Sequence, residues 1–265
     1  MKQFIENKFA YTFNKANKEN AQVILFIHGF ATNSDYHDLA IPYLSEYDYY
    51  AIELPGHNIA PKQTNEKNTF ARFIDYIIEF IEYKDFNNFI LIGHSMGGGL
   101  ATCVSTRVAE RISKSIFITP FNTQITLNSI NIFKFFPNNL DQAFKHQSLI
   151  YKYPRDFFPT NDCDKLKSIL KYQLDNRKEF RKLSWNLMSI STLNLVNNAL
   201  KHLTDKSFLI TGENDKIINS KATLRLYKKY IPAINCYEIK DASHLPFIEK
   251  TNEYINIIKT IIAGN

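Results

Sequence analysis

The stretch from Phe89 to Leu100, FILIGHSMGGGL, decides the fold of this chain. It begins with a short, uninterrupted apolar run, which is typical of a parallel strand buried on both faces. The next residues, GHSMG, fit the pattern G-x-S-x-G, in which a strand turns abruptly into a helix and glycines leave room for the turn. We therefore expect Ser95 to project from the carboxyl end of a sheet, where open α/β sheets bind ligands. A glycine-rich turn with a chance serine is the alternative, but the flanking strand and helix patterns favour a functional serine.

Length and composition indicate a protein with a full core. The chain has 265 residues, of which 45% are hydrophobic, so one large domain or a domain with an insertion is expected. Its three cysteines stand at wide spacings without a metal-type pairing, so we expect neither a disulfide scaffold nor a metal site. The N-terminal region has no secretory-type apolar segment, and no apolar run reaches the roughly eighteen residues of a membrane span. A soluble, cytoplasmic protein is therefore predicted.

Strand-like and helix-like segments alternate on both sides of Ser95. Aromatic alternation over residues 4–13 indicates one or two short strands at a sheet edge. Strands separated by helices predict an α/β fold with a mostly parallel, doubly wound sheet. Buried-strand patterns occur at residues 22–27, 49–54, 89–92, 115–119, 207–211 and 234–239, and helical patterns at residues 36–44, 69–83, 97–109, 192–203, 220–230 and 246–262.

The alternation stops after Pro120. Between residues 121 and 189 the sequence contains no buried-strand run, and helical fragments alternate with proline and asparagine breaks. A structureless connection of this length is uncommon inside a compact domain. We therefore expect a helical cap, or lid, at residues 121–189, inserted into a core formed by residues 1–120 and 190–265.

Two further loops carry the side chains that a nucleophilic serine needs, which are a general base and an acid that orients it. Asp215 and His244 each follow a predicted strand, so both are expected at the same sheet edge as Ser95. Glu213 and Asp241 are rival acids. We favour Asp215, because Asp241 stands too close in sequence to His244 to reach its Nδ1 atom without distorting the turn.

These motifs resemble those of the α/β-hydrolase superfamily, from Val23 essentially to the C-terminus. The resemblance rests on GHSMG, GENDKI and ASHLPF, which contain Ser95, Asp215 and His244 in that order, and on the turn HGF at residues 28–30. The chain is most similar to serine carboxylesterases and to monoacylglycerol-lipase-like members with a helical cap. The resemblance implies an α/β-hydrolase fold and a catalytic role for the three named side chains.

The family resemblance also implies an oxyanion hole. Two backbone N–H groups must converge on the developing alkoxide, and Phe30 and Met96 are in position to supply them. Because main-chain donors impose no side-chain identity, the same two residues are equally compatible with lining the acyl pocket.

Other residues of the motif loops have structural interpretations. We expect His28, His57 and His94 to hydrogen-bond the loops to one another rather than to act in catalysis. The family's usual Asp-Leu-Pro-Gly-His-Gly is ELPGHN at residues 53–58. Asparagine tolerates a left-handed backbone nearly as well as glycine, so this departure is expected to affect the shape of the loop more than the chemistry.

Together these residues predict a serine hydrolase that cleaves carboxylic esters of short to medium acyl chains, as a carboxylesterase or lipase does. It would act through an acyl-enzyme on Ser95 and without a cofactor. A serine at this position argues against the epoxide-hydrolase and dehalogenase branches, which need a carboxylate nucleophile. One alternative is an aminopeptidase of the proline-iminopeptidase type, but the acids of the cap are outnumbered by bases. Another is a catalytically silent hydrolase fold that serves as a binding protein, which the complete triad disfavours.

The cap combines positive charge with apolar side chains. Between residues 121 and 190, eleven Lys or Arg and six Asp or Glu give this segment +5 of the chain's net charge of +6. Phe133, Phe136 and Phe157 are candidates for lining an acyl-binding cleft above Ser95. Basic residues around that cleft would attract anionic esters or an anionic lipid surface, while a solvated lysine-rich face is an equally open alternative.

The expected partner is therefore a small ester or an acylglycerol. The sequence contains no zinc spacing, RNP-type strand or basic helix, so no nucleic-acid partner is expected despite the positive charge. No stable protein partner is evident from the sequence.

Overall fold

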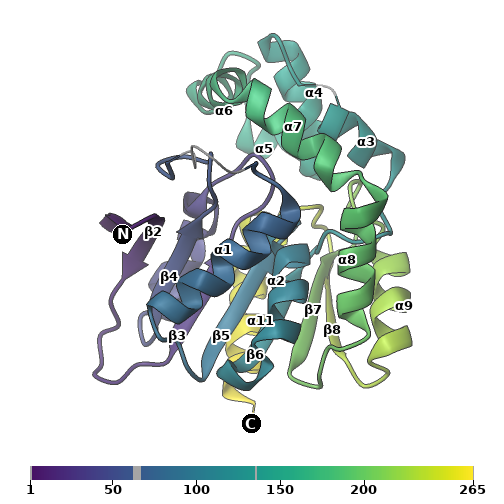
Figure 1. Cartoon of the computed structure of the whole chain (residues 1–265). Coiled ribbons are helices and arrows are strands. Elements are labelled where there is room, and N and C mark those ends of the chain that lie inside the picture. The colour runs from purple at the N-terminus through teal and green to yellow at the C-terminus, as the bar shows by residue number, and fades with distance from the viewer. Residues whose placement is uncertain (1, 62–66, 135, 265) are drawn as a thin grey trace.

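A mixed eight-stranded sheet lies at the centre of the computed structural model, which describes residues 2–61, 67–134 and 136–264 except for the side chains of residues 132–134 (Figure 1). β1 pairs antiparallel with β2, and β2 with β4, whereas all pairs from β4 to β8 are parallel. The predicted α/β class, with a mostly parallel, doubly wound sheet, is confirmed. In spatial order the strands are β1 (Lys2–Glu6), β2 (Phe9–Asn14), β4 (Asp48–Glu53), β3 (Val23–Ile27), β5 (Phe89–His94), β6 (Ile112–Ile118), β7 (Ser207–Gly212) and β8 (Asn235–Ile239).

Helices pack on both faces of the sheet. The helix α1 illustrates why, because Phe73, Ile77 and Phe80 recur at spacings of three and four and form one buried stripe. One face is covered by α1 (Phe70–Tyr83), α2 (Met96–Arg107), α8 (Ile190–Leu200) and α9 (Ser220–Tyr230), with the short η2 (Ala109–Arg111) after α2. The other face is covered by η1 (Ser34–Leu44), α10 (Pro246–Glu249) and α11 (Thr251–Ala263).

The prediction of one closing helix over residues 246–262 is wrong. The helix is divided at Lys250, whose backbone has φ −137° and ψ 54°. On the short α10, the Phe247 ring packs edge-on against the His94 ring at a centroid distance of 4.9 Å. On α11, Tyr254 and Ile258 pack into the core under the sheet. The break lets one segment contact the loop after β5 while the other follows the sheet.

The described residues between β6 and α8 form five helices above the carboxyl ends of the strands (Figure 1). We refer to residues 121–189 as the cap, with the boundaries that the sequence predicts. α4 packs against α6, and α3 packs against α7. No helix in the described part of the chain is both long and apolar enough to cross a bilayer. The cap helices are α3 (Leu127–Lys134), α4 (Leu140–Ile150), α5 (Pro154–Phe157), α6 (Asp164–Asp175) and α7 (Arg177–Leu187).

Candidate active site

Ser95 lies at a sharp turn between β5 and α2. Its backbone has φ 54° and ψ −118°, a conformation that is strained for a residue with a side chain. The flanking glycines are required by close contacts of the backbone. A Cβ atom on Gly97 would lie 2.2 Å from the Ile27 carbonyl oxygen, and one on Gly93 would lie 2.3 Å from the Gly97 carbonyl oxygen. The turn therefore holds Ser95 at the carboxyl end of β5, directly beside the end of β3.

The structure brings Ser95, Asp215 and His244 together from the loops after β5, β7 and β8. His244 Nε2 lies 2.9 Å from Ser95 Oγ, and His244 Nδ1 lies 2.9 Å from Asp215 Oδ2. A neutral imidazole with its proton on Nδ1 fits both contacts, since it donates to the carboxylate and accepts from the hydroxyl. The other oxygen of Asp215 accepts the backbone N–H groups of Ile217 and Ile218 at 2.7 and 3.0 Å. The carboxylate is thus oriented by its own loop.

The two rival acids lie elsewhere. Asp241 is exposed and pairs with Lys152 Nζ at 2.5 Å, and this hydrogen bond lowers the pKa of the Asp241 carboxyl. Glu213 is also exposed, and its Oε2 atom accepts the Asp241 N–H at 3.3 Å. Of the three candidate acids, Asp215 is the one in contact with His244.

The turn at residues 28–30 lies against Ser95, because a Cβ atom on Gly29 would lie 3.3 Å from Ser95 Cβ. The Gly29 carbonyl oxygen accepts hydrogen bonds from His28 Nδ1 at 2.8 Å and from Thr32 Oγ1 at 3.0 Å. In a trans peptide the carbonyl and the following N–H point to opposite sides. The N–H of Phe30, a residue that lines the cavity beside Ser95, therefore points away from His28 and Thr32.

Met96, the second expected donor, is the first residue of α2. Its N–H has no acceptor within the helix, as is general for the first turn. The Met96 side chain is buried in the core, and it is not among the side chains that line the cavity.

The three histidines of the motif loops are buried, and burial lowers the pKa of each. The Leu54 N–H donates to His28 Nε2 at 3.1 Å, so that nitrogen carries no proton and His28 donates through Nδ1. His94 Nε2 donates to the His244 carbonyl oxygen at 2.9 Å. The His57 ring packs on the His28 ring at a centroid distance of 4.9 Å. His28 and His94 thus hydrogen-bond the loops around Ser95, as predicted, whereas the prediction is wrong for His57, whose two ring nitrogens are buried without a hydrogen-bond partner among the described residues.

The departures from the family pattern at residues 53–58 contact each other. Asn58, at φ 42°, has the left-handed backbone that the sequence suggested. Its side-chain amide donates to Glu53 Oε1 at 2.9 Å. The same oxygen accepts both the N–H and the hydroxyl of Ser34, at 3.1 and 2.6 Å. The hydrogen bonds of Glu53 with Asn58 and Ser34 therefore hold this loop against the start of η1.

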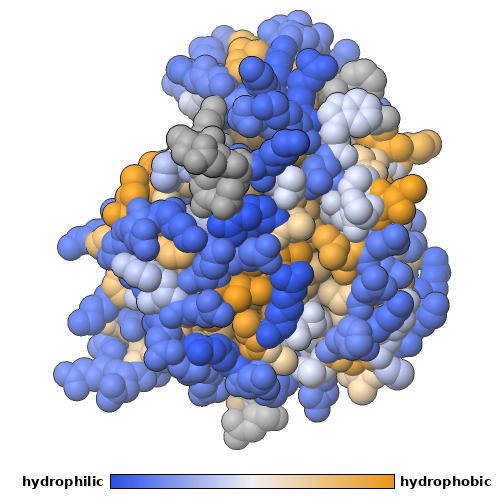
Figure 2. All heavy atoms as spheres, in the orientation of Figure 1, coloured by the Kyte–Doolittle hydropathy of each residue, from blue (hydrophilic) through white to orange (hydrophobic). Residues whose placement is uncertain are grey.

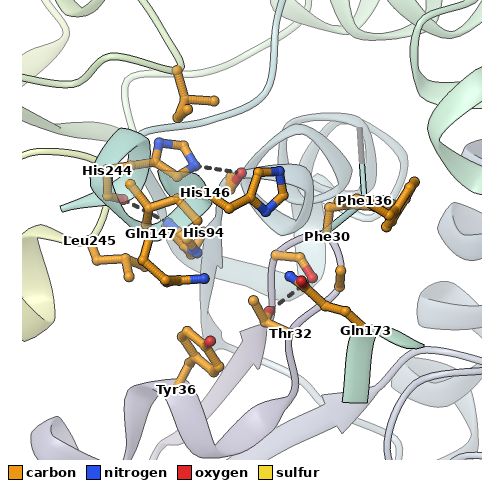
Figure 3. Close-up of a pocket in the computed structure, with 15 residues that line it drawn as sticks. Phe30, Thr32, Tyr36, His94, Phe136, His146, Gln147, Gln173, His244 and Leu245 are labelled. Carbon is orange, nitrogen blue, oxygen red and sulfur yellow. Dashed lines mark hydrogen bonds between the residues drawn. The ribbon is translucent and has the colours of Figure 1, made fainter. Parts of the chain in front are cut away.

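A small cavity lies beside Ser95, between the core and the cap (Figure 3). Of the predicted acyl-pocket residues, Phe136 lines it. Phe157 does not, since it packs on the Tyr151 ring at a centroid distance of 4.6 Å. Phe133 lies in α3, but its side chain is outside the described residues. A second cavity, open to solvent beside α3 and α4, shares Phe136 and His146 with the first.

Besides Thr32, which follows the turn at residues 28–30, sequence reasoning missed four polar residues of the cavity wall. They are Tyr36 of η1, His146 and Gln147 of α4, and Gln173 of α6. A signal for the last three was present, because each occupies a buried position on an amphipathic helix. In α6, for example, the buried stripe runs through Leu166 and Leu170 to Gln173. A polar side chain on an apolar stripe is a mark of a partner that the helix itself does not supply.

Basic residues of α7 lie on the outer face of the cap, whereas Lys145 lines the second cavity. Lys178, Arg181 and Lys182 are exposed on α7 and line a shallow surface hollow. The outer surface of the cap, at the top of Figure 2, is mostly hydrophilic. Among the described residues that line the cavity beside Ser95, none is a Lys, Arg, Asp or Glu. The cavity wall thus combines apolar side chains with histidines and with polar side chains that carry no formal charge.

The cap also contacts the loop that carries His244. The His244 N–H donates to the carbonyl oxygen of Ile150, the last residue of α4, at 3.0 Å. The Glu249 carboxylate accepts the Lys152 N–H at 2.7 Å and the Ser243 N–H at 2.8 Å. The loop is therefore held from the cap side as well as by His94 from the core.

Comparisons with known proteins identify the family of the fold. A sequence model of the alpha/beta hydrolase fold family matches residues 22–172. The chain is 27% identical over 263 residues to "Putative esterase/lipase 3" of Mycoplasma genitalium, with 98% of this chain and 93% of that protein covered. It is 29% identical over 260 residues to the protein of the same name from Mycoplasma pneumoniae, with coverage of 96% and 91%.

Solved structures with a similar fold include 2-hydroxy-6-oxo-6-phenylhexa-2,4-dienoate hydrolase from Rhodococcus sp. strain RHA1. Its TM-score is 0.85 at 14% sequence identity, and the match covers 99% of this chain and 98% of that one. At this identity the likeness concerns the fold.

Proposed function

The chain belongs to the alpha/beta hydrolase fold family, and we propose that it hydrolyses carboxylic esters through an acyl-enzyme on Ser95. The family and the names of the relatives support hydrolase activity. The observation that carries the finer proposal is the pair of 2.9 Å contacts that connects Ser95 Oγ through His244 to Asp215. They form the arrangement that nucleophilic catalysis by serine requires.

In the proposed mechanism, Ser95 Oγ attacks the ester carbonyl carbon while His244 Nε2 takes the hydroxyl proton. Asp215 holds the proton on Nδ1 and stabilises the imidazolium that forms. The N–H groups of Phe30 and Met96 bind the oxyanion of the tetrahedral intermediate. The carbon–oxygen bond to the alcohol then breaks, and His244 returns its proton to the leaving oxygen. A water molecule then attacks the acyl-enzyme while His244 takes one of its protons. The bond between the acyl carbon and Ser95 Oγ breaks, His244 returns the proton to Ser95, and the acid is released.

The shape of the site supports acyl chains longer than acetyl. The cavity beside Ser95 and the outer cavity share Phe136 and His146 in their walls, and the outer cavity adds the apolar side chains of Pro137 and Leu149. An acyl chain extending past Phe136 would bury its methylene groups there. We therefore expect kcat/KM to rise from acetyl to medium-chain p-nitrophenyl esters.

The aminopeptidase alternative has less support. A free α-amino group bound next to the scissile bond calls for a carboxylate, and the described residues that line the cavity supply neither Asp nor Glu. A catalytically silent binding protein would not need the hydrogen-bonded geometry of the three side chains. We further propose a cytoplasmic enzyme that needs no cofactor. The three cysteines, which are unbridged in the structure, are compatible with a reducing compartment.

A covalent probe tests the proposal. A fluorophosphonate should label the wild-type protein on Ser95, and Ser95→Ala should lower kcat/KM for p-nitrophenyl butyrate by about four to six orders of magnitude. Ser105→Ala, in the helix that follows the turn, is the matched control and should retain both labelling and activity. Labelling that persists in Ser95→Ala, or turnover that is unchanged by it, would contradict the proposal.

A further inference from the structure

Two glutamines of the cap project into the cavity beside Ser95 without a partner. Gln147 and Gln173 are 3% and 7% exposed, and their side chains form no hydrogen bonds with the rest of the described chain. The carbonyl oxygen of the Gln173 side chain is fully enclosed without a donor. In Figure 3 the two side chains extend into the cavity from opposite sides. A buried amide without a partner destabilises a fold, so a ligand that pairs with these amides has a specific reason to bind.

Tyr36 of η1 adds a hydroxyl to the same cavity from the core, below the glutamines in the view of Figure 3. Burial raises its pKa to about 12, so the phenol stays protonated and acts as a neutral donor and acceptor. Two amides and a phenol can each both donate and accept. They therefore match hydroxyl groups, which do the same, better than they match an anion.

The charges around the cavity support a neutral ligand. The described lining includes no Lys or Arg that would compensate a carboxylate or phosphate. Burial and the nearby His244 keep the pKa of His94 well below its ordinary value, so this histidine provides no cation either. An anion would thus be buried without a dedicated counter-charge, which is costly. A neutral polyol carries several hydroxyl groups and avoids that cost.

The two cavities are suited to different parts of the substrate. Gln147 lies on the side of His244 and Leu245, where the leaving alcohol must receive its proton (Figure 3). The outer cavity, which shares Phe136 with the first, offers apolar surface to an acyl chain. We propose that the alcohol part of the substrate is a short neutral polyol, whose hydroxyl groups bind Gln147, Gln173 and Tyr36. This inference rests on the proposed esterase function and specifies its substrate.

Two esters of equal size test it. The alcohol parts of glycerol 1-butyrate and n-pentyl butyrate have the same number of non-hydrogen atoms, but only the glycerol ester carries free hydroxyl groups. For the wild-type protein we expect kcat/KM to be at least about tenfold higher for the glycerol ester, which corresponds to one or more net hydrogen bonds. This comparison needs no variant and does not depend on the stability of any mutant.

Variants assign the preference to residues. Gln147→Leu and Gln173→Leu should each reduce the ratio of the two kcat/KM values about tenfold, because leucine has similar size but cannot hydrogen-bond. Gln3→Leu, at an exposed position of β1, is the matched control and should leave the ratio unchanged. The labelling rate of Ser95 by the fluorophosphonate and the thermal midpoint show that each variant is folded with an intact nucleophile.

The outcomes separate this inference from the esterase proposal. A wild-type ratio near or below one, or a ratio that neither glutamine variant changes, overturns the inference. If Ser95 is labelled and n-pentyl butyrate is hydrolysed in that case, the esterase proposal stands. If neither ester is hydrolysed and Ser95 is not labelled, both fail.

Discussion

The cavity beside Ser95 has a core wall, which includes Ser95 and His244, and a cap wall, which includes Gln147 and Gln173. The two walls hold their polar groups in different ways. On the core wall, His244 contacts Asp215 behind it, and the second oxygen of Asp215 accepts two N–H groups of its own loop. On the cap wall, Gln147 and Gln173 are buried and form no side-chain hydrogen bonds within the described residues. We infer that hydrogen bonds of the core wall hold the reacting groups in place, whereas the side-chain amides of the cap wall are available to hydrogen-bond a ligand. Substitutions on the core wall should therefore act on kcat, and those on the cap wall on the choice of substrate.

The largest effect expected to test this contrast is on the core wall. Asp215→Asn should lower kcat by about ten-thousandfold with the fold intact, because asparagine favours the wrong imidazole tautomer of His244. Asp241→Asn removes an exposed pair with Lys152 and should leave kcat nearly unchanged. Steady-state kinetics on p-nitrophenyl butyrate measures both. If Asp241→Asn is as damaging as Asp215→Asn, the acid has been assigned to the wrong residue.

The same contrast explains what the sequence could predict. Each reacting side chain of the core lies in a short sequence motif, in which a strand is followed directly by the turn or loop that carries the side chain. GHSMG therefore predicted the turn, and the loops after two further strands predicted Asp215 and His244. Their proximity in the structure follows from topology, because the carboxyl ends of parallel strands lie at one edge of the sheet.

The cap wall could not be predicted in the same way. Gln147 and Gln173 lie on different helices, and their convergence depends on how α4 packs on α6, which no local motif specifies. Phe157 shows the opposite error, because an aromatic residue in the cap was expected at the cleft and instead packs on Tyr151. The break at Lys250 was also invisible, because both helices continue an apolar pattern and differ only in direction.

The next prediction concerns Glu249, which connects the cap with the loop that carries His244. Its carboxylate joins the N–H groups of Lys152 in the cap and Ser243 beside His244. Glu249→Gln replaces one acceptor with a donor that faces an N–H group, so the His244 loop loses a support. As a positioning residue, Glu249 should affect kcat, with a decrease of about tenfold and little change in KM. Glu253→Gln, at an exposed position of α11, is the control. An increase in KM with kcat intact would indicate a substrate-binding role instead.

The difference in free energy of unfolding between wild type and Glu249→Gln should depend on pH. Burial raises the pKa of Glu249 above its ordinary value of 4.5, so the folded protein binds this proton more tightly than the unfolded chain does. The contribution to stability is therefore present below about pH 4.5 and is lost as the pH rises through the higher folded pKa. Urea unfolding from about pH 4 to about pH 7 should show wild type losing free energy of unfolding relative to Glu249→Gln. A constant difference across that range would contradict the burial of this carboxyl.

The smallest expected effect concerns the outer face of the cap, where basic residues of α7 lie away from the cavity beside Ser95. We propose that this face contacts anionic lipid surfaces, because Lys178 and Arg181 are exposed on α7 and each cation near such a surface contributes about 1 kcal/mol. Lys178→Glu should lower the rate on ester dispersed in anionic vesicles severalfold, and added salt should reduce the difference.

Lys15→Glu, an equally exposed lysine outside the cap, is the matched control and should have little effect. Vesicles of neutral lipid separate surface attraction from a change in the active site, because the attraction disappears there while a catalytic defect persists. If wild-type turnover on anionic vesicles does not depend on salt, or if both lysine variants behave alike, then the lysines of α7 form an ordinary solvated face. In that case the cap would influence the reaction only through its inner wall, where Gln147 and Gln173 lie.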